Sequence, residues 1–69
     1  MSDLIDARGY SCPEPVIMLK KAMAEGAASY EMLVDNRVSV ENATRYATHQ
    51  GYRVDVTEEG DDFRLRMER

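Results

Sequence analysis

The sequence has few of the residues that stabilise small domains covalently or through large aromatic side chains. It contains one cysteine, two prolines, one phenylalanine and no tryptophan among 69 residues. A single cysteine excludes an internal disulfide, so packing alone must hold the fold together. We expect one small domain, residues 1–69, with a core large enough for only modest stability.

Signals for export, membrane insertion and nucleic-acid binding are also absent from the sequence. Residues 1–6 contain no basic region and no long apolar run, so neither a signal peptide nor a membrane span is expected. We therefore expect a cytoplasmic protein, in which the glycosylation pattern at residues 42–44 has no meaning. The net charge of −4 and the lack of a basic stripe argue against direct binding to nucleic acid.

Motifs for metals and cofactors are missing as well. His49 is the only histidine and Cys12 the only cysteine, so the sequence offers no set of metal ligands at the usual spacing. It contains no glycine-rich phosphate loop. We expect no metal and no cofactor.

An apolar stripe predicts a helix over residues 13–25. Val16, Leu19 and Met23 fall at i, i+3 and i+7, which is one face of a helix. Gly26 follows where such a helix would end, in the left-handed cap position that favours glycine.

The only cysteine and both prolines lie together at the start of this helix, in Cys12-Pro13-Glu14-Pro15. Proline is tolerated in the first helical turn because those N–H groups have no intrahelical partner. The prolines therefore place Cys12 at the helix N-cap or one position from it. A helix N-terminus carries partial positive charge and free N–H donors, which stabilise a thiolate. The alternative, an inert core cysteine, is disfavoured because a cap position is half exposed and electropositive.

Three neighbours modify the expected environment of this thiol. Arg8 is close in sequence and could add positive charge that supports the thiolate. Gly9 permits an unusual backbone angle just before the turn. Glu14 acts in the opposite direction, because its carboxylate competes for the helix dipole.

Two stretches on either side of this helix predict strands. Leu4–Ala7 is expected to be an edge or near-edge strand. In the second strand, Tyr30–Asp35, alternate residues starting at Tyr30 are expected to face the core. Leu33 then lies on the solvent face, where it is a potential contact point for another protein. A strand, a helix and a strand within about thirty residues predict a crossover between parallel strands.

The residues after the second strand predict a second helix. Ser39 is expected to be its N-cap, with Val38 and Ala43 forming a hydrophobic staple. Gly51 is expected to end it. Tyr46 is expected to pack at its margin, as is Tyr52, although a tyrosine cluster could instead form a ligand site. Three residues form its apolar stripe: Val40, Ala43 and Ala47.

The last part of the chain predicts a β-hairpin. Residues 52–57 and 63–68 alternate between apolar and polar side chains, and residues 58–62 join them. Each run has one charged face, as expected for a sheet covered on one side only, and opposite charges should pair across strands there. Both helices must then cover the other face. The expected fold is a two-layer α/β (α+β) sandwich in the order βαβαββ.

The start of the first helix carries the signature of a known family. The run Asp6-x-Arg8-Gly9-x-x-Cys12-Pro13-Glu14-Pro15, followed by an apolar helix and this element order, resembles the TusA/SirA/YedF family of sulfur-carrier proteins. Residues 34–36, 40–42, 45 and 51–52 are similar to the YedF-type branch linked to selenium metabolism. The resemblance implies a four-stranded mixed sheet with two helices on one face, like the C-terminal domain of translation initiation factor three.

The resemblance also implies a role for Cys12. This residue would accept sulfane sulfur as a persulfide from a protein donor, a cysteine desulfurase or a rhodanese-like protein, and pass it to an acceptor protein. Pro13, Glu14, Pro15 and Lys20, around the first helical turn, would lie at the docking surface for these partners. For Lys20, simple solvation of a helix lysine is the alternative.

Two further functions remain open at this point. The same thiol could carry selenium, because both elements use one soft nucleophile. Alternatively, the domain is a non-catalytic regulatory or adaptor module whose surface matters and whose thiol does not. A redox sensor that forms an intermolecular disulfide is a variant of that reading.

Overall fold

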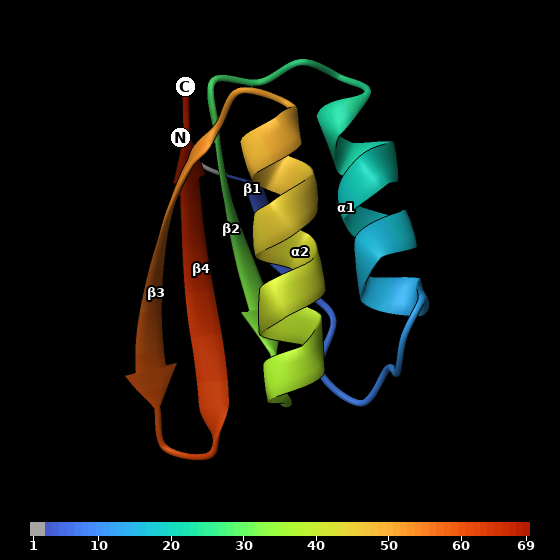
Figure 1. Cartoon of the computed structure of the whole chain (residues 1–69), viewed down its shortest axis with the longest axis vertical. Coiled ribbons are helices and arrows are strands. Elements are labelled where there is room, and N and C mark those ends of the chain that lie inside the picture. Colours follow the sequence, from blue (N-terminus) through green and yellow to red (C-terminus); the bar gives the residue numbers. More distant parts are fainter. Residues whose placement is uncertain (1–2) are drawn as a thin grey trace.

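The sheet of the computed structural model contains four strands in the order β1-β2-β4-β3, with two helices on one side of it (Figure 1). The structure describes residues 3–69. Along the chain the elements are β1 (Asp3–Asp6), α1 (Glu14–Met23), β2 (Ser29–Val34), α2 (Arg37–His49), β3 (Arg53–Glu59) and β4 (Asp62–Glu68). β1 and β2 are parallel, whereas β4 is antiparallel to both β2 and β3. This arrangement confirms the predicted βαβαββ fold.

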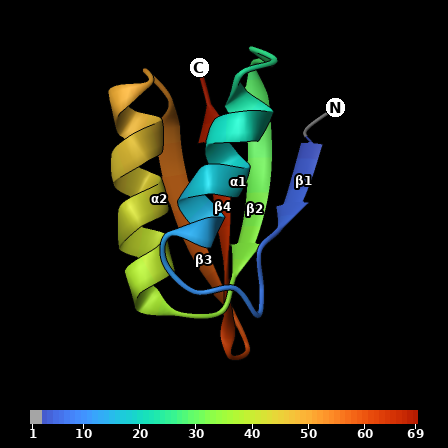
Figure 2. The same cartoon turned by 90° about the vertical axis from the view of Figure 1, so that its right-hand side faces the viewer.

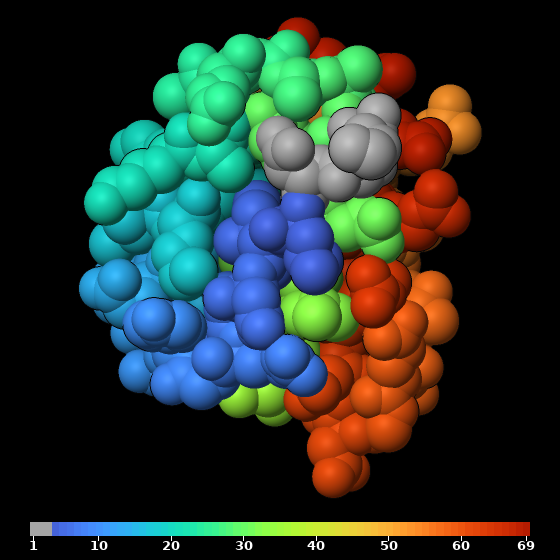
Figure 3. Space-filling view, turned by 180° about the vertical axis from the view of Figure 1, so that it is seen from behind, coloured from blue at the N-terminus to red at the C-terminus, as the bar shows by residue number. Residues whose placement is uncertain are grey.

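Both helices cover the same face of the sheet. Figures 1 and 2 place α1 and α2 in one layer on one side of the strands. Figure 3 shows the opposite face, where β1, β2, β4 and β3 lie side by side at the molecular surface. β1 and β3 are the edge strands, as predicted for the first of them. None of the helices in residues 3–69 is long and apolar enough to span a lipid bilayer.

The core fills the space between the helix layer and the sheet. Tyr30, Met32 and Val34 of β2 are all buried, as their alternation predicts. Burying such side chains contributes most of the favourable free energy of folding in a domain of this size. The helices supply the facing buried residues: Leu19 and Met23 from α1, and Val40, Ala43 and Ala47 from α2.

Two core tyrosines fasten the turn that follows α1. The rings of Tyr30 and Tyr52 lie 5.8 Å apart. The Tyr30 hydroxyl donates to the carbonyl of Ala22 (2.7 Å) and accepts from the N–H of Ala27 (3.0 Å). The Tyr52 hydroxyl donates to the carbonyl of Ala27 (2.7 Å). Because buried hydroxyls need partners, these bonds hold residues 22–27 against the sheet. Tyr52 therefore has a packing role.

The N-terminus of α2 lies earlier than predicted. Asn36 is the N-cap, and its Oδ1 accepts a hydrogen bond from the N–H of Ser39 at 2.8 Å. Ser39 is buried inside the first turn, and Val38 is 56% exposed, so the predicted cap and hydrophobic staple are both wrong. Asparagine and serine are both strong capping residues, and here the Asn36 side chain makes the capping bond while Ser39 supplies the N–H. The predicted end of the helix at Gly51, with φ of +89°, is confirmed.

The open face of the sheet is charged, and it shields Leu33. This residue is only 8% exposed, so the prediction that it forms a surface contact point is wrong. It lies on a central strand, between Asp6 of β1 and Arg64 of β4 in the register of the sheet. Side chains directly opposite in adjacent strands are close neighbours, and the aliphatic stem of an arginine can cover apolar surface.

Charges pair across the strands of the open face, as predicted. Arg64 donates to Glu31 of β2 at 3.0 Å and to Glu59 of β3 at 2.7 Å. Its guanidinium lowers the pKa of Glu59, mainly through the side-chain hydrogen bond. β3 and β4 remain paired as far as Glu59 and Asp62, so the hairpin turn is shorter than the predicted residues 58–62.

We expect Leu19→Ala to destabilise the domain strongly. Leu19 is fully buried between α1 and the sheet, and such truncations cost about 2–5 kcal/mol of unfolding free energy. Urea unfolding followed by circular dichroism measures this loss. Ile17→Ala, two residues away on the same helix and 38% exposed, is the control and should cost less than ~1 kcal/mol. Equal losses for the two variants would contradict the packing of α1 described here.

Candidate functional site

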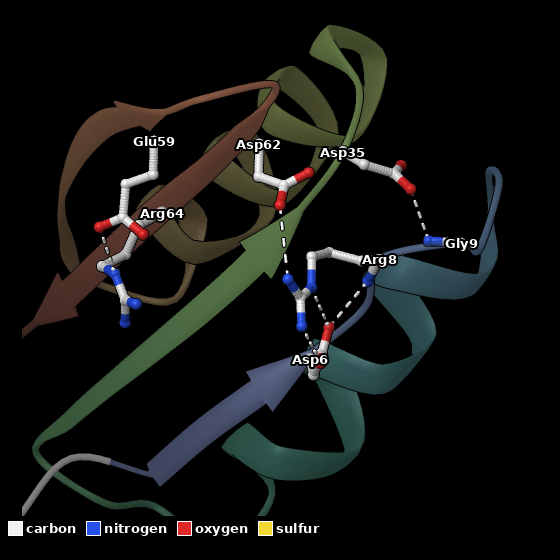
Figure 4. Close-up of polar contacts among 7 residues, drawn as sticks. All are labelled: Asp6, Arg8, Gly9, Asp35, Glu59, Asp62 and Arg64. Atoms are coloured by element: carbon white, nitrogen blue, oxygen red, sulfur yellow. Dashed lines mark hydrogen bonds and ion pairs between the residues drawn. The ribbon is translucent and has the colours of Figure 1, made fainter.

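The loop that carries Cys12, residues 7–13, is tied to the sheet at its start. Ala7 is buried, and its N–H donates to the carbonyl of Leu33 at 2.9 Å. The N–H of Gly9 donates to the carboxylate of Asp35 at 2.6 Å (Figure 4), and this bond is the main cause of a lowered pKa of Asp35. Gly9 has φ of +84°, which side chains other than glycine rarely tolerate, so the predicted unusual angle is confirmed.

The side chain of Arg8 contacts two carboxylates, those of Asp6 and Asp62 (Figure 4). Its Nε and Nη2 donate to Asp6 at 3.0 and 2.9 Å, and its Nη1 donates to Asp62 of β4 at 3.4 Å. The side-chain bond from Arg8 is the largest cause of the low pKa of Asp6, about 2, followed by the bond from the Arg8 backbone N–H. Within residues 3–69 these are the hydrogen-bond partners of the Arg8 side chain. Contrary to the expectation, Arg8 therefore does not support the thiolate through a direct contact. It instead holds the loop to Asp6 of β1 and Asp62 of β4.

Cys12 is exposed and lies one position before the N-cap of α1, which is Pro13. This placement is one of the two that the prolines predict. The Cys12–Pro13 peptide bond is cis. Pro15 is buried in the first turn and anchors the end of the helix against the core, while Pro13 and Glu14 remain exposed beside the thiol.

The first turn of α1 offers fewer free N–H donors than the sequence analysis assumed. Pro13 and Pro15 have no N–H, and the N–H of Glu14 donates to the carbonyl of Ser11 at 2.9 Å. Only the N–H of Val16 is left without a partner within residues 3–69. None of the hydrogen bonds in that part of the chain joins a first-turn N–H to the sulfur of Cys12. The helix dipole acts on the sulfur, but its terminal amides do not bind it.

The hydrogen bond to the sulfur comes from the other helix. Nδ2 of Asn42, in α2, donates to Sγ of Cys12 at 3.6 Å. Donors of this kind stabilise negative charge on their acceptor. The sequence analysis missed this role, because Asn42 is thirty positions from Cys12 along the chain. The only available signal was its place on a helix expected to pack in the same layer as the first.

Cys12 opens onto a groove of about 410 Å³ between the two helices. Figure 1 shows that α1 and α2 run in the same direction, with the N-terminal turn of α1 beside the first half of α2. The start of α1 lines the groove with three residues: Cys12, Pro13 and Val16. α2 lines it with one stripe, at i, i+3, i+4 and i+7: Asn42, Arg45, Tyr46 and His49. The thiol therefore lies at one end of this partly apolar groove.

Lys20 lies apart from the other residues predicted to surround the thiol. It is exposed in the last turn of α1, whereas Glu14 is in the first. The two are six positions apart, which is about 9 Å along the helix axis. Lys20 is thus not a first-turn residue, contrary to the prediction, because the observed helix spans only three turns and Lys20 falls near its end.

The chemistry available here is that of one accessible sulfur nucleophile. The structure brings no three metal-binding side chains together within residues 3–69. The chain has no second cysteine that could resolve a bond formed on Cys12. An exposed thiol with an amide donor and an adjoining groove is suited to thiol exchange with a second molecule.

Comparison with known proteins identifies the family. A family profile described as Sulfurtransferase TusA matches residues 4–69. The chain belongs to the TusA family. A protein of Methanocaldococcus jannaschii that is provisionally named a sulfur carrier protein is 37% identical over 57 residues, or 80% of this chain and 76% of that protein. The crystal structure of a SirA-like protein from Desulfitobacterium hafniense matches with a TM-score of 0.84 and 36% identity, over 94% of this chain and 93% of that one.

We expect Asn42→Ala to slow the reaction of Cys12 with iodoacetamide by about three- to tenfold, because a hydrogen bond to an ionised acceptor is lost on an exposed surface. Second-order rate constants from intact-mass time courses measure the effect. Thr48→Ala, an exposed change on the same helix outside the groove, is the control. Equal rates for wild type and Asn42→Ala would mean that the amide does not act on the sulfur.

The link between Asp6 and Arg8 predicts a stability change in acid. The pKa of Asp6 is lowered from 3.8 to about 2, so its contribution is complete above pH 3.8 and disappears as the pH falls to about 2. The difference in unfolding free energy between wild type and Asp6→Asn should therefore shrink across this window, as measured by urea unfolding at each pH. A difference that stays constant across this window for Asp6→Asn would refute the assigned pKa shift.

Proposed function

We propose that this protein is a sulfur carrier that accepts sulfane sulfur as a persulfide on Cys12 from one protein and passes it to another. The observation that carries the proposal is the exposed Sγ of Cys12, hydrogen-bonded by Asn42 at the mouth of a groove, in a chain of the TusA family. The provisional name of the archaeal relative supports the same assignment. The proposed compartment is the cytoplasm, where thiols are kept reduced.

The transfer step needs only thiol exchange. The thiolate of Cys12 attacks the outer sulfur of a donor persulfide, the sulfur–sulfur bond of the donor breaks, and the donor thiolate leaves. Cys12 then carries the outer sulfur as its own persulfide, so no external oxidant or reductant is consumed. The acceptor's thiolate then attacks the outer sulfur of the Cys12 persulfide, and the thiolate of Cys12 leaves. Because the chain has one cysteine, no internal thiol can release the sulfur before the acceptor arrives.

Asn42 and the end of α1 both favour this chemistry. The amide of Asn42 stabilises negative charge on Sγ, both as the attacking thiolate and as the thiolate that leaves when the acceptor takes the outer sulfur. The dipole of α1 adds to this effect, because Cys12 directly precedes its N-cap. No general base is required if the thiol reacts in its ionised form.

Partner proteins would dock around the exposed end of α1. Pro13 and Glu14 follow Cys12 directly in the chain and are exposed, so they would form part of the surface that a donor meets. Lys20 extends this surface along the helix, nearer its C-terminal end. Pro15 is buried and would act by fixing the turn rather than by touching a partner. The donor would be a cysteine desulfurase or a rhodanese-like protein.

Incubation with an active cysteine desulfurase and cysteine, without an acceptor, tests the proposal. Intact-mass spectrometry should detect the gain of one sulfur atom on the wild-type protein and no gain on Cys12→Ser, because serine forms no persulfide. The exposed position of Cys12 makes the serine variant a conservative one that should keep its fold. A rhodanese charged with sulfur serves as the second donor. Failure of both donors to load the wild-type thiol would refute the proposed function.

A further inference from the structure

The groove beside Cys12 has the dimensions and composition of a small-molecule site. Its volume of about 410 Å³ is within the range of ligand pockets, ~300–1,000 Å³. Such pockets combine an apolar lining with a few polar groups that orient the ligand. Here Val16 and Tyr46 supply apolar surface, Asn42 and Arg45 supply donors, and Cys12 supplies a nucleophile.

The charge of the groove is opposite to that of the whole chain. The net charge is −4, yet the lining includes the guanidinium of Arg45 and no carboxylate. The side chain of Arg45 has no hydrogen bond or ion pair with another residue of the 3–69 range, and neither has that of His49. By contrast, Arg8 and Arg64 are paired with carboxylates elsewhere on the surface. The side chains of Arg45 and His49 are therefore available to an external anion.

These donors lie at a defined spacing from the sulfur. Asn42 contacts Sγ of Cys12, and Arg45 and His49 follow it on the same stripe of α2. At 1.5 Å per residue, they are about 4.5 and 10.5 Å further along the helix axis. An anionic group bound there would be separated from Cys12 by only a few covalent bonds of an intervening ligand.

We propose that the groove binds a low-molecular-weight persulfide that carries a carboxylate, and that such a molecule can charge Cys12 directly. The carboxylate would pair with Arg45, assisted by an N–H of His49, while the persulfide reaches Cys12 beside Asn42. This inference rests on the proposed function and adds a small-molecule sulfur source to the protein donor.

The reaction balances without a further reagent. The thiolate of Cys12 attacks the outer sulfur of R–S–SH, a new sulfur–sulfur bond forms on Cys12, and the bond between the two donor sulfurs breaks. The products are the Cys12 persulfide and the thiolate R–S⁻. Cys12 is oxidised to the persulfide level as the donor is reduced to its thiol level.

Cysteine persulfide and cysteamine persulfide form a matched pair of probes, because they differ only in the carboxylate. Rates of sulfur addition to Cys12, measured by intact mass under desulfurase-free conditions, should be about fivefold higher with cysteine persulfide. The overall charge of the protein would favour the cationic cysteamine derivative, so this preference must arise locally.

Arg45→Gln should abolish most of this preference by slowing the reaction with cysteine persulfide alone. Arg53→Gln is the matched control, because Arg53 is also exposed but lies on β3, outside the groove. Both variants change the net charge equally and remove no described ion pair.

The outcomes separate this inference from the proposed function. Suppose that a desulfurase charges Cys12, but Arg45→Gln and Arg53→Gln add sulfur from cysteine persulfide at the same rate. The groove then does not bind the carboxylate, and the inference is wrong. The same conclusion follows if Arg45→Gln slows the reactions of cysteine persulfide and cysteamine persulfide equally. If neither a protein donor nor a small persulfide charges Cys12, both the proposed function and this inference are wrong.

Discussion

An exposed side chain can hold a fixed position only if its buried neighbours determine the backbone that carries it. The loop before α1 meets this requirement at both ends. Ala7 is buried and bonded to β2, and Gly9 is bonded to Asp35 at the end of the same strand. On the other side of the thiol, Pro15 is buried in the first turn of α1. Cys12 therefore stands in solvent between two anchored segments, and every property of the site depends on that double attachment.

Two different parts of the fold act on the sulfur. α1 contributes its dipole, but its prolines and the bond between Glu14 and Ser11 remove most of the amides that could bind the thiolate directly. α2 contributes the amide of Asn42. The packing of the two helices in one layer is what brings this amide to the sulfur, so the reactivity of the site depends on tertiary structure rather than on the helix terminus alone.

Much of the fold was predictable from local pattern. The alternation at Tyr30, Met32 and Val34 identified the buried face of β2, and the apolar spacing of α2 identified its buried stripe. In α1 the spacing correctly placed Leu19 and Met23 in the core, whereas Val16 is only half-buried and lines the groove. These signals are reliable because an element that is buried on one face carries apolar residues at the repeat of that helix or strand. The exposed position of Cys12 followed from the same kind of local rule, since prolines fit only the first turn of a helix.

The errors arose where the outcome depends on neighbours distant in sequence or on competition between similar residues. Leu33 alternates as a surface residue should, yet flanking strands shield it. Arg8 is near Cys12 in the chain, but the carboxylates of Asp6 and Asp62 are closer in space. Asn36 and Ser39 compete for one cap, and composition alone does not rank them. Asn42 reaches the sulfur only because of how the helices pack.

The two prolines have a further consequence for encounters with other molecules. Their rings fix φ at both positions, so the chain on either side of Glu14 has few conformations to lose. Rigid surfaces surrender little freedom when they form a complex, which lowers the entropic penalty of association. A carrier that binds one partner and then another benefits from this low entropic penalty, because the same rigid turn can form each brief contact without changing its conformation.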